Sequence, residues 1–91
     1  MDVRHEVMDV LTTAWTNTGM LLGQSSPSRL QIIATYDQLV GKMIKLVQQE
    51  FGGSEDWAMQ LLEGNCFTLE DFQDSVWATQ FDTERRALQQ L

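Results

Sequence analysis

Hydrophobic residues recur along this chain at three- and four-residue intervals, the spacing that places side chains on one face of an α-helix. Three interruptions divide the pattern into four segments: Pro27 with its neighbouring serines, the pair Gly52 and Gly53, and Gly64 followed by Asn65. No segment shows the alternation of apolar and polar residues that predicts a strand. The sequence therefore predicts an all-α fold, a small bundle of four helices, in one domain that spans residues 1–91.

The first segment, about residues 2–22, is predicted to form one helix with a broad apolar face. The face comprises Val3, Val7, Val10, Leu11, Ala14, Trp15, Leu21 and Leu22. Several threonines and Gly19 lower the helix propensity of this segment. We therefore expect the helix to depend on packing against its neighbours.

The second segment has clear start and stop signals. Ser26 is predicted to be the N-cap, with Pro27 at the first helical position, where a missing N–H costs nothing. The helix should continue to Phe51 and end at Gly52 in a left-handed conformation. Gly41 lies in its middle, and we expect a close helix contact there, because such a glycine otherwise only destabilises a helix.

Apolar residues cover more than half of the circumference of this second helix. They form two rows: Ile33, Tyr36, Val40, Met43 and Val47, and Ile32, Leu39 and Leu46. A helix with one buried side does not need so wide an apolar arc, so the helix is either central in the bundle or part of an interface. We predict a two-fold homodimer, with Tyr36, Leu39, Met43 and Leu46 as the apolar partner-binding residues. Whether this face serves self-association or a different protein stays open.

Two further helices are predicted in the last 40% or so of the chain. Ser54 should cap a short helix with Trp57, Ala58, Leu61 and Leu62 on its apolar side, ending at Gly64. Thr68 should cap the next helix, with Asp71 completing a capping box and with Phe67 and Phe72 forming a hydrophobic staple.

Residues 69–91 contain no glycine or proline, which favours one continuous helix. A fifth helix starting at Asp82 is the alternative. The apolar side of this segment comprises Leu69, Phe72, Val76, Trp77, Phe81, Leu88 and Leu91. We expect Trp15, Trp57 and Trp77 to lie in the core, whereas a tryptophan left on the surface would indicate an interface.

The charge balance is acidic and unevenly distributed. Six Lys and Arg stand against 13 Asp and Glu, for a net charge of −7, and residues 54–91 hold eight of the acids but only two of the bases. This balance disfavours direct binding to nucleic acid or to a membrane, because both need clustered cations. It favours a protein partner with a basic surface, for which Glu70, Asp71 and Asp74 are the predicted acidic rim. The alternative is that the acidity serves solubility alone.

Residues for catalysis or metal binding are scarce. The chain has one cysteine, Cys66, and one histidine, His5, whereas a zinc site needs three or four converging ligands. A lone cysteine cannot form an internal disulfide and fits a reducing compartment, so we expect a cytoplasmic protein. We predict no catalytic residues, no metal, no cofactor and no enzymatic activity.

Together these patterns predict a small acidic helical protein-binding module. It would act as an adaptor, an inhibitor or a chaperone-like regulator, through an apolar groove with an acidic rim. The alternative is an acidic nucleic-acid mimic that blocks a DNA- or RNA-binding protein.

Overall fold

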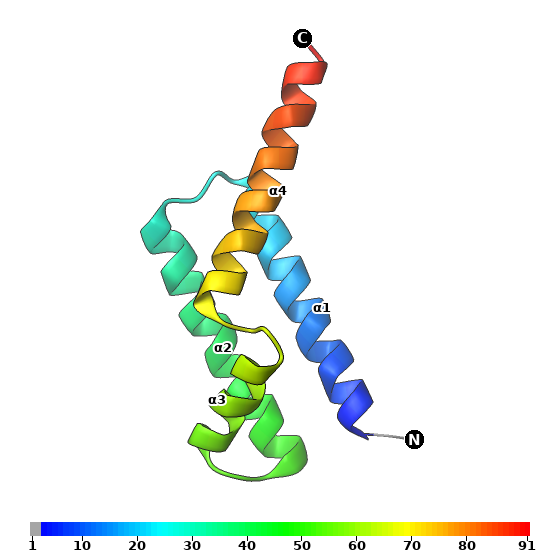
Figure 1. The fold of residues 1–91 in the computed structure, drawn as a ribbon, viewed down its shortest axis with the longest axis vertical. Coiled ribbons are helices and arrows are strands. Elements are labelled where there is room, and N and C mark those ends of the chain that lie inside the picture. Colours follow the sequence, from blue (N-terminus) through cyan, green and yellow to red (C-terminus); the bar gives the residue numbers. More distant parts are fainter. Residues whose placement is uncertain (1–2) are drawn as a thin grey trace.

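The computed structural model describes residues 3–91, and four α-helices account for most of them (Figure 1). They are α1 (Val3–Gln24), α2 (Arg29–Phe51), α3 (Glu55–Gly64) and α4 (Leu69–Gln89). The all-α prediction is confirmed, and the described residues contain no strand. The last segment forms one continuous helix, so the alternative of a separate helix starting at Asp82 is wrong.

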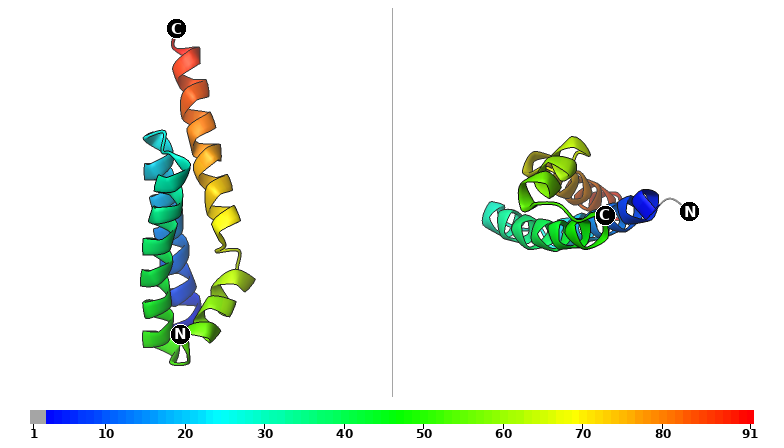
Figure 2. Two further views of the ribbon diagram at one scale, coloured as in Figure 1. Left: turned by 90° about the vertical axis from the view of Figure 1, so that its left-hand side faces the viewer. Right: turned by 90° about the horizontal axis from the view of Figure 1, so that it is seen from below.

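The helices lie in two layers, with α1 and α2 side by side in one and with α3 and α4 on the same side of that pair (Figure 2). α4 packs mainly on α1, and α2 contacts α1, α3 and α4. Neither α3 nor α4 lies on the opposite side of the α1–α2 pair (Figure 2). The last turns of α4 extend past the ends of α1 and α2, which gives the molecule its 52 Å length (Figure 1).

All four helices contribute to one hydrophobic core. The fully or nearly buried apolar residues are Val7, Leu11, Trp15, Ile32, Leu39, Val40, Met43, Ile44, Val47, Ala58, Leu62, Phe67, Phe72 and Val76. Trp15 of α1 is the centre of an aromatic cluster, with ring centroids 5.0 Å from Phe67, 5.1 Å from Phe72 and 6.2 Å from Tyr36. The edge-on arrangement of these rings is the one that their quadrupoles favour.

Two glycines of α1 allow α4 to approach closely. A Cβ on Gly23 would lie 2.7 Å from Thr79 Cβ and 2.8 Å from the Val76 carbonyl oxygen, and one on Gly19 would lie 3.2 Å from Ser75 Oγ. Residue numbers rise together along both helices, so the two helices run parallel. The close contact expected at Gly41 is wrong, because nothing lies within 4 Å of a Cβ there.

Most of the predicted helix ends are confirmed. Ser54 caps α3 by accepting a hydrogen bond from the Trp57 N–H. Thr68 caps α4 together with Asp71 in a capping box. Gly52 ends α2 with the expected positive φ of 74°, although its ψ of −159° lies outside the left-handed helical region.

The start predicted for α2 is wrong by two residues. Ser28, rather than Ser26, is the N-cap, and its hydroxyl and backbone N–H form a capping box with Gln31. Ser26 has a φ of 51°, so it belongs to the turn, and Pro27 precedes the cap. Gln31 is the reason for the shift, because its side chain, three residues after Ser28, accepts a hydrogen bond from the cap N–H. Arg29, three residues after Ser26, has no acceptor and could not complete such a box.

Candidate functional site

The four predicted apolar partner-binding residues do not share one exposed surface. Leu39 and Met43 are only 8% and 2% exposed, which agrees with a central place of this helix in the bundle rather than with an open face at these two residues. Tyr36 turns into the aromatic cluster, 6.2 Å from both Trp15 and Phe72. Leu46 is half-buried and lies on the side of α2 near Val10 of α1. A partner-binding role for these residues stays a prediction.

Leu39, Met43 and Leu46 do meet at a shallow groove on the open side of the α1–α2 pair. They line a hollow of about 170 Å³ together with Val10 and Ala14 of α1 and Lys42 of α2. Val10 is 55% exposed, although the sequence pattern placed it on the same apolar face as the buried Val7 and Leu11. Lys42 is the single charged residue among those that line the groove in the described part of the chain, and the others are apolar.

The three residues of the predicted acidic rim differ in exposure and in hydrogen bonding. Asp71 is half-buried and acts within the capping box, where its Oδ2 accepts hydrogen bonds from the Thr68 N–H at 3.2 Å and from Thr68 Oγ1 at 2.6 Å. Glu70 and Asp74 are exposed and have no such role in the described part of the chain. Two of the three predicted acids are therefore available to a partner.

Helix α4 carries three large exposed apolar side chains, two of them aromatic. Trp77, Phe81 and Leu88 are 49%, 68% and 69% exposed. Steps of four and seven residues place these three side chains on one face of the helix, and the same periodicity continues back through Asp74 and Glu70. We call Glu70, Asp74, Trp77, Phe81, Glu84 and Leu88 the outer face of α4. It points away from the Ser75 and Thr79 side chains that pack against α1.

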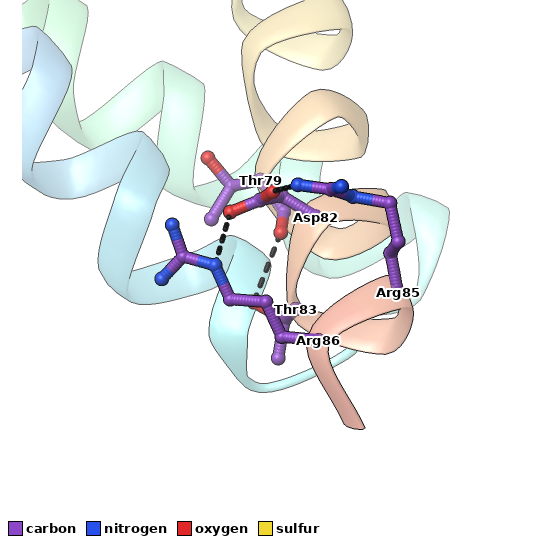
Figure 3. Close-up of polar contacts among 5 residues, drawn as sticks. All are labelled: Thr79, Asp82, Thr83, Arg85 and Arg86. Atoms are coloured by element: carbon purple, nitrogen blue, oxygen red, sulfur yellow. Dashed lines mark hydrogen bonds and ion pairs between the residues drawn. The ribbon is translucent and has the colours of Figure 1, made fainter. Parts of the chain in front are cut away.

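The electrostatics of the outer face are dominated by carboxylates. Arg85 lies beside it, but its guanidinium is 2.9 Å from the Asp82 carboxylate, and Arg86 is 3.1 Å from the same group (Figure 3). The hydrogen bond from Arg85, followed by the charge of Arg86, holds the pKa of the Asp82 carboxyl below its ordinary value. Glu70, Asp74 and Glu84 therefore leave the face with an excess of negative charge.

The sequence pattern missed this face because it placed Trp77, Phe81 and Leu88 on the same apolar side of the helix as Phe72 and Val76. The signal that could have found it is the separation between two apolar rows on α4. Phe72 and Val76 form the buried row, whereas Trp77, Phe81 and Leu88 lie nearly opposite them around the helix.

A second exposed tryptophan borders a different hollow. Trp57 of α3 is half-exposed and lies edge-on to Phe51 of α2, with ring centroids 6.4 Å apart. The two rings, with Arg4, Met8, Leu61 and Asn65, line a hollow of about 340 Å³. Its volume is at the lower limit of small-molecule pockets.

Potential nucleophiles and metal ligands are dispersed. The described residues contain no group of three or more His, Cys, Asp or Glu side chains that could hold a metal ion. Cys66 is exposed and has a φ of 66° in the connection between α3 and α4. His5 is exposed on the first turns of α1. The expectations of no enzymatic activity and no cofactor stay predictions.

No described helix is long and apolar enough to cross a membrane. Comparison of the chain with protein-family models, curated proteins and solved structures finds no match.

Proposed function

We propose that this chain is a small helical protein-binding module and that the outer face of α4 binds a basic amphipathic helix of another protein. The observation that carries the proposal is the exposure of Trp77, Phe81 and Leu88 on a helix face that also bears Glu70, Asp74 and Glu84. The apolar groove predicted on the second helix is thereby replaced by a face on α4, while the acidic rim is kept in part.

The apolar half of this face has the properties of a binding anchor. Tryptophan and other aromatic side chains are enriched among the residues that contribute most binding energy at interfaces. Contiguous exposed apolar residues with polar surroundings are typical of interaction sites. Trp77 and Phe81, one turn apart on a well-formed helix, provide a rigid pair for an apolar side chain to pack between.

A helical partner fits the shape of the face. The three apolar residues form a narrow row along about 16 Å of helix, since eleven residues separate Trp77 from Leu88 at 1.5 Å each. A row of this width matches the seam of two packed helices, in which side chains at positions a and d of the partner interdigitate with it.

A basic partner fits the charge of the face. Lysines or arginines that flank the apolar row of the partner would meet Glu70, Asp74 and Glu84, and such complementarity speeds association and excludes acidic competitors. The alternative function, nucleic-acid mimicry, has no comparable support, because aromatic side chains interrupt the row of carboxylates.

The test uses two synthetic probe peptides that form amphipathic helices, one of leucine and lysine heptads and one of leucine and glutamate heptads. We expect the lysine probe, followed by fluorescence anisotropy, to bind the full chain and the glutamate probe not to bind. The double variant Trp77→Ala, Phe81→Ala should weaken binding by at least about tenfold, the scale of two anchor residues.

Leu30→Ala is the matched control, because Leu30 is 78% exposed on α2 and lies outside the face. This variant should bind the lysine probe as the unchanged chain does. Equal binding by the Trp77→Ala, Phe81→Ala variant would show that the probe is attracted by net charge alone and would refute the proposed site.

A further inference from the structure

The open side of the α1–α2 pair is a second unpartnered surface, separate from the outer face of α4. Val10 of α1 and Leu46 of α2 lie at its centre, since both line two adjoining hollows of about 160 and 170 Å³. Among residues 3–91, no other helix covers this side (Figure 2).

Opposite charges lie at equal distances on either side of Leu46. Lys42 lines one hollow and Glu50 lines the other, four residues before and four residues after Leu46. Steps of four residues keep Lys42, Leu46 and Glu50 on one face of α2. Both charged side chains are exposed, and neither forms an ion pair within residues 3–91.

This spacing makes the surface complementary to itself. A two-fold axis through Leu46, perpendicular to the helices, places two α2 helices antiparallel, with Leu46 against its own copy. Lys42 of each subunit then meets Glu50 of the other, so one axis creates two ion pairs. On α1, the same axis places Val10 against its copy and Glu6 opposite Ala14.

The charges also exclude the other face-to-face arrangement. An axis parallel to the helices would place α1 of one subunit over α2 of the other. Glu6 and Glu50, which line the same hollow, would then face each other across the interface as like charges.

We infer that the α1–α2 face binds a second copy of this chain in an antiparallel two-fold dimer centred on Val10 and Leu46, with reciprocal Lys42–Glu50 ion pairs. This inference does not rest on the function proposed for α4. The homodimer and the place of Leu46 in its interface agree with the sequence prediction. Val10, rather than Tyr36, lies at the centre of the inferred interface.

The overlap of the two subunits is small. It extends along about 20 Å of two helices, each about 10 Å wide, which corresponds to about 800 Å² over both subunits. Stable interfaces bury about 1,200–2,000 Å², so the dimer should be weak and should dissociate on dilution.

The test is sedimentation equilibrium of the full chain from micromolar to millimolar concentration. We expect the mass to rise from 10.4 kDa towards twice that value. Lys42→Glu and Glu50→Lys should each weaken the dimer about tenfold, because each turns two attractive pairs into two repulsive ones. An equal mixture of these two variants should dimerise again, since both cross-subunit pairs are restored in the heterodimer.

Lys45→Glu makes the same change of charge on α2 outside both hollows, and it should leave the dimer unaffected. A mass of 10.4 kDa at every concentration would overturn the inference. So would a dimer that both single variants leave unchanged. Trp77→Ala with Phe81→Ala separates the two proposals, because it should weaken probe binding by at least about tenfold and spare the dimer.

Discussion

Cys66 occupies a backbone position that usually belongs to glycine. The Cys66 N–H donates to the Glu63 carbonyl oxygen at 3.2 Å, and the Phe67 N–H donates to the Leu62 carbonyl oxygen at 3.0 Å. This pair of bonds is the Schellman motif, with Cys66 as its left-handed residue at φ 66°. Phe67 and Leu62, both buried, supply the apolar contact that accompanies the motif. Phe67 thus ends α3 and also precedes the N-cap of α4.

We predict that Cys66→Gly stabilises the fold. The left-handed conformation costs a residue with a Cβ about 1–2 kcal/mol, and glycine avoids this cost but loses more chain entropy on folding. The free energy of unfolding should therefore rise by up to about 1 kcal/mol, measured from the urea midpoint at unchanged slope. Cys66→Ser, which keeps the Cβ, should stay within about 0.5 kcal/mol of the unchanged chain. A destabilised glycine variant would disprove the cost assigned to this position.

Tyr36 should titrate at higher pH in the folded protein than in the unfolded chain. Burial, followed by the charges of Asp37, Glu63 and Asp71, raises the pKa of its phenol above the ordinary value of 10.0. The folded state therefore favours the neutral form. Its contribution to stability is fully present below pH 10.0 and is lost as the pH rises through the raised pKa of the folded state.

Ultraviolet absorbance of the phenolate measures this titration directly, because the chain has a single tyrosine. Phenolate absorbance should appear at lower pH in urea than in buffer. Tyr36→Phe should remove the part of the alkaline loss of stability that this group causes. A folded protein that titrates at the same pH as the unfolded chain would contradict the burial of Tyr36.

At the scale of the elements, the contact between α1 and α4 depends on small residues. Gly19 and Gly23 face Ser75 and Thr79, so small side chains one turn apart meet on both helices. The sequence pattern interpreted Gly19 only as a loss of helix propensity and assigned close packing to Gly41. A helical propensity describes one helix alone, whereas the need for a glycine depends on which face meets a neighbour.

Two alanine substitutions at glycines should have opposite effects on stability. Gly23→Ala would force a Cβ to within 2.8 Å of the Val76 carbonyl oxygen and should destabilise the fold by about 2 kcal/mol. Gly41→Ala meets nothing within 4 Å and should stabilise it by up to about 1 kcal/mol. Urea unfolding followed by circular dichroism measures both. Similar effects at the two positions would refute the close approach of α1 and α4.

Helix boundaries could be predicted where a local signal determines them. Ser54 and Thr68 were found because each caps its helix through hydrogen bonds to residues three positions away. The N-cap of α2 was ambiguous, because Ser26 and Ser28 both flank Pro27. The position of Gln31, three residues after Ser28, is the sequence signal that favours Ser28. The apolar faces were predicted less well, because periodicity shows which residues share a side but not whether another helix covers it.

At the scale of the whole molecule, α4 is longer than the bundle that it joins. Its first half packs on α1 and α2, and its second half extends beyond both (Figure 1). Phe81 and Leu88 are therefore exposed, although their sequence pattern resembles that of a buried face. Trp77, in contrast, lies beside the packed residues Val76 and Thr79, and it is exposed because the outer face points away from α1.

Charge reversal on the outer face should act mainly on the rate of association. Glu70→Lys with Asp74→Lys should slow association with the lysine probe more than it speeds dissociation, because exposed charges steer the encounter whereas buried anchors set the lifetime. Stopped-flow fluorescence measures both rates. Salt should slow association as well, since the Debye length falls from about 10 Å at 0.1 M to about 3 Å at 1 M. Asp71 is left unchanged because it accepts the hydrogen bond from the Thr68 N–H that completes the capping box of α4.

Circular dichroism of the doubly reversed variant is the control for folding. An association rate that responds neither to the reversal nor to salt would mean that Glu70 and Asp74 serve solubility alone. The apolar row would then be the whole binding surface.

The most direct test of the proposed binding face is a map of the backbone amide resonances of the full, isotope-labelled chain as the lysine probe is added. We predict that the largest shifts fall on Glu70, Asp74, Trp77, Phe81 and Leu88, with the α1–α2 face around Val10 and Leu46 unaffected. Shifts that centre on Val10 and Leu46, or that spread evenly over all acidic residues, would contradict the assignment of α4 as the binding surface.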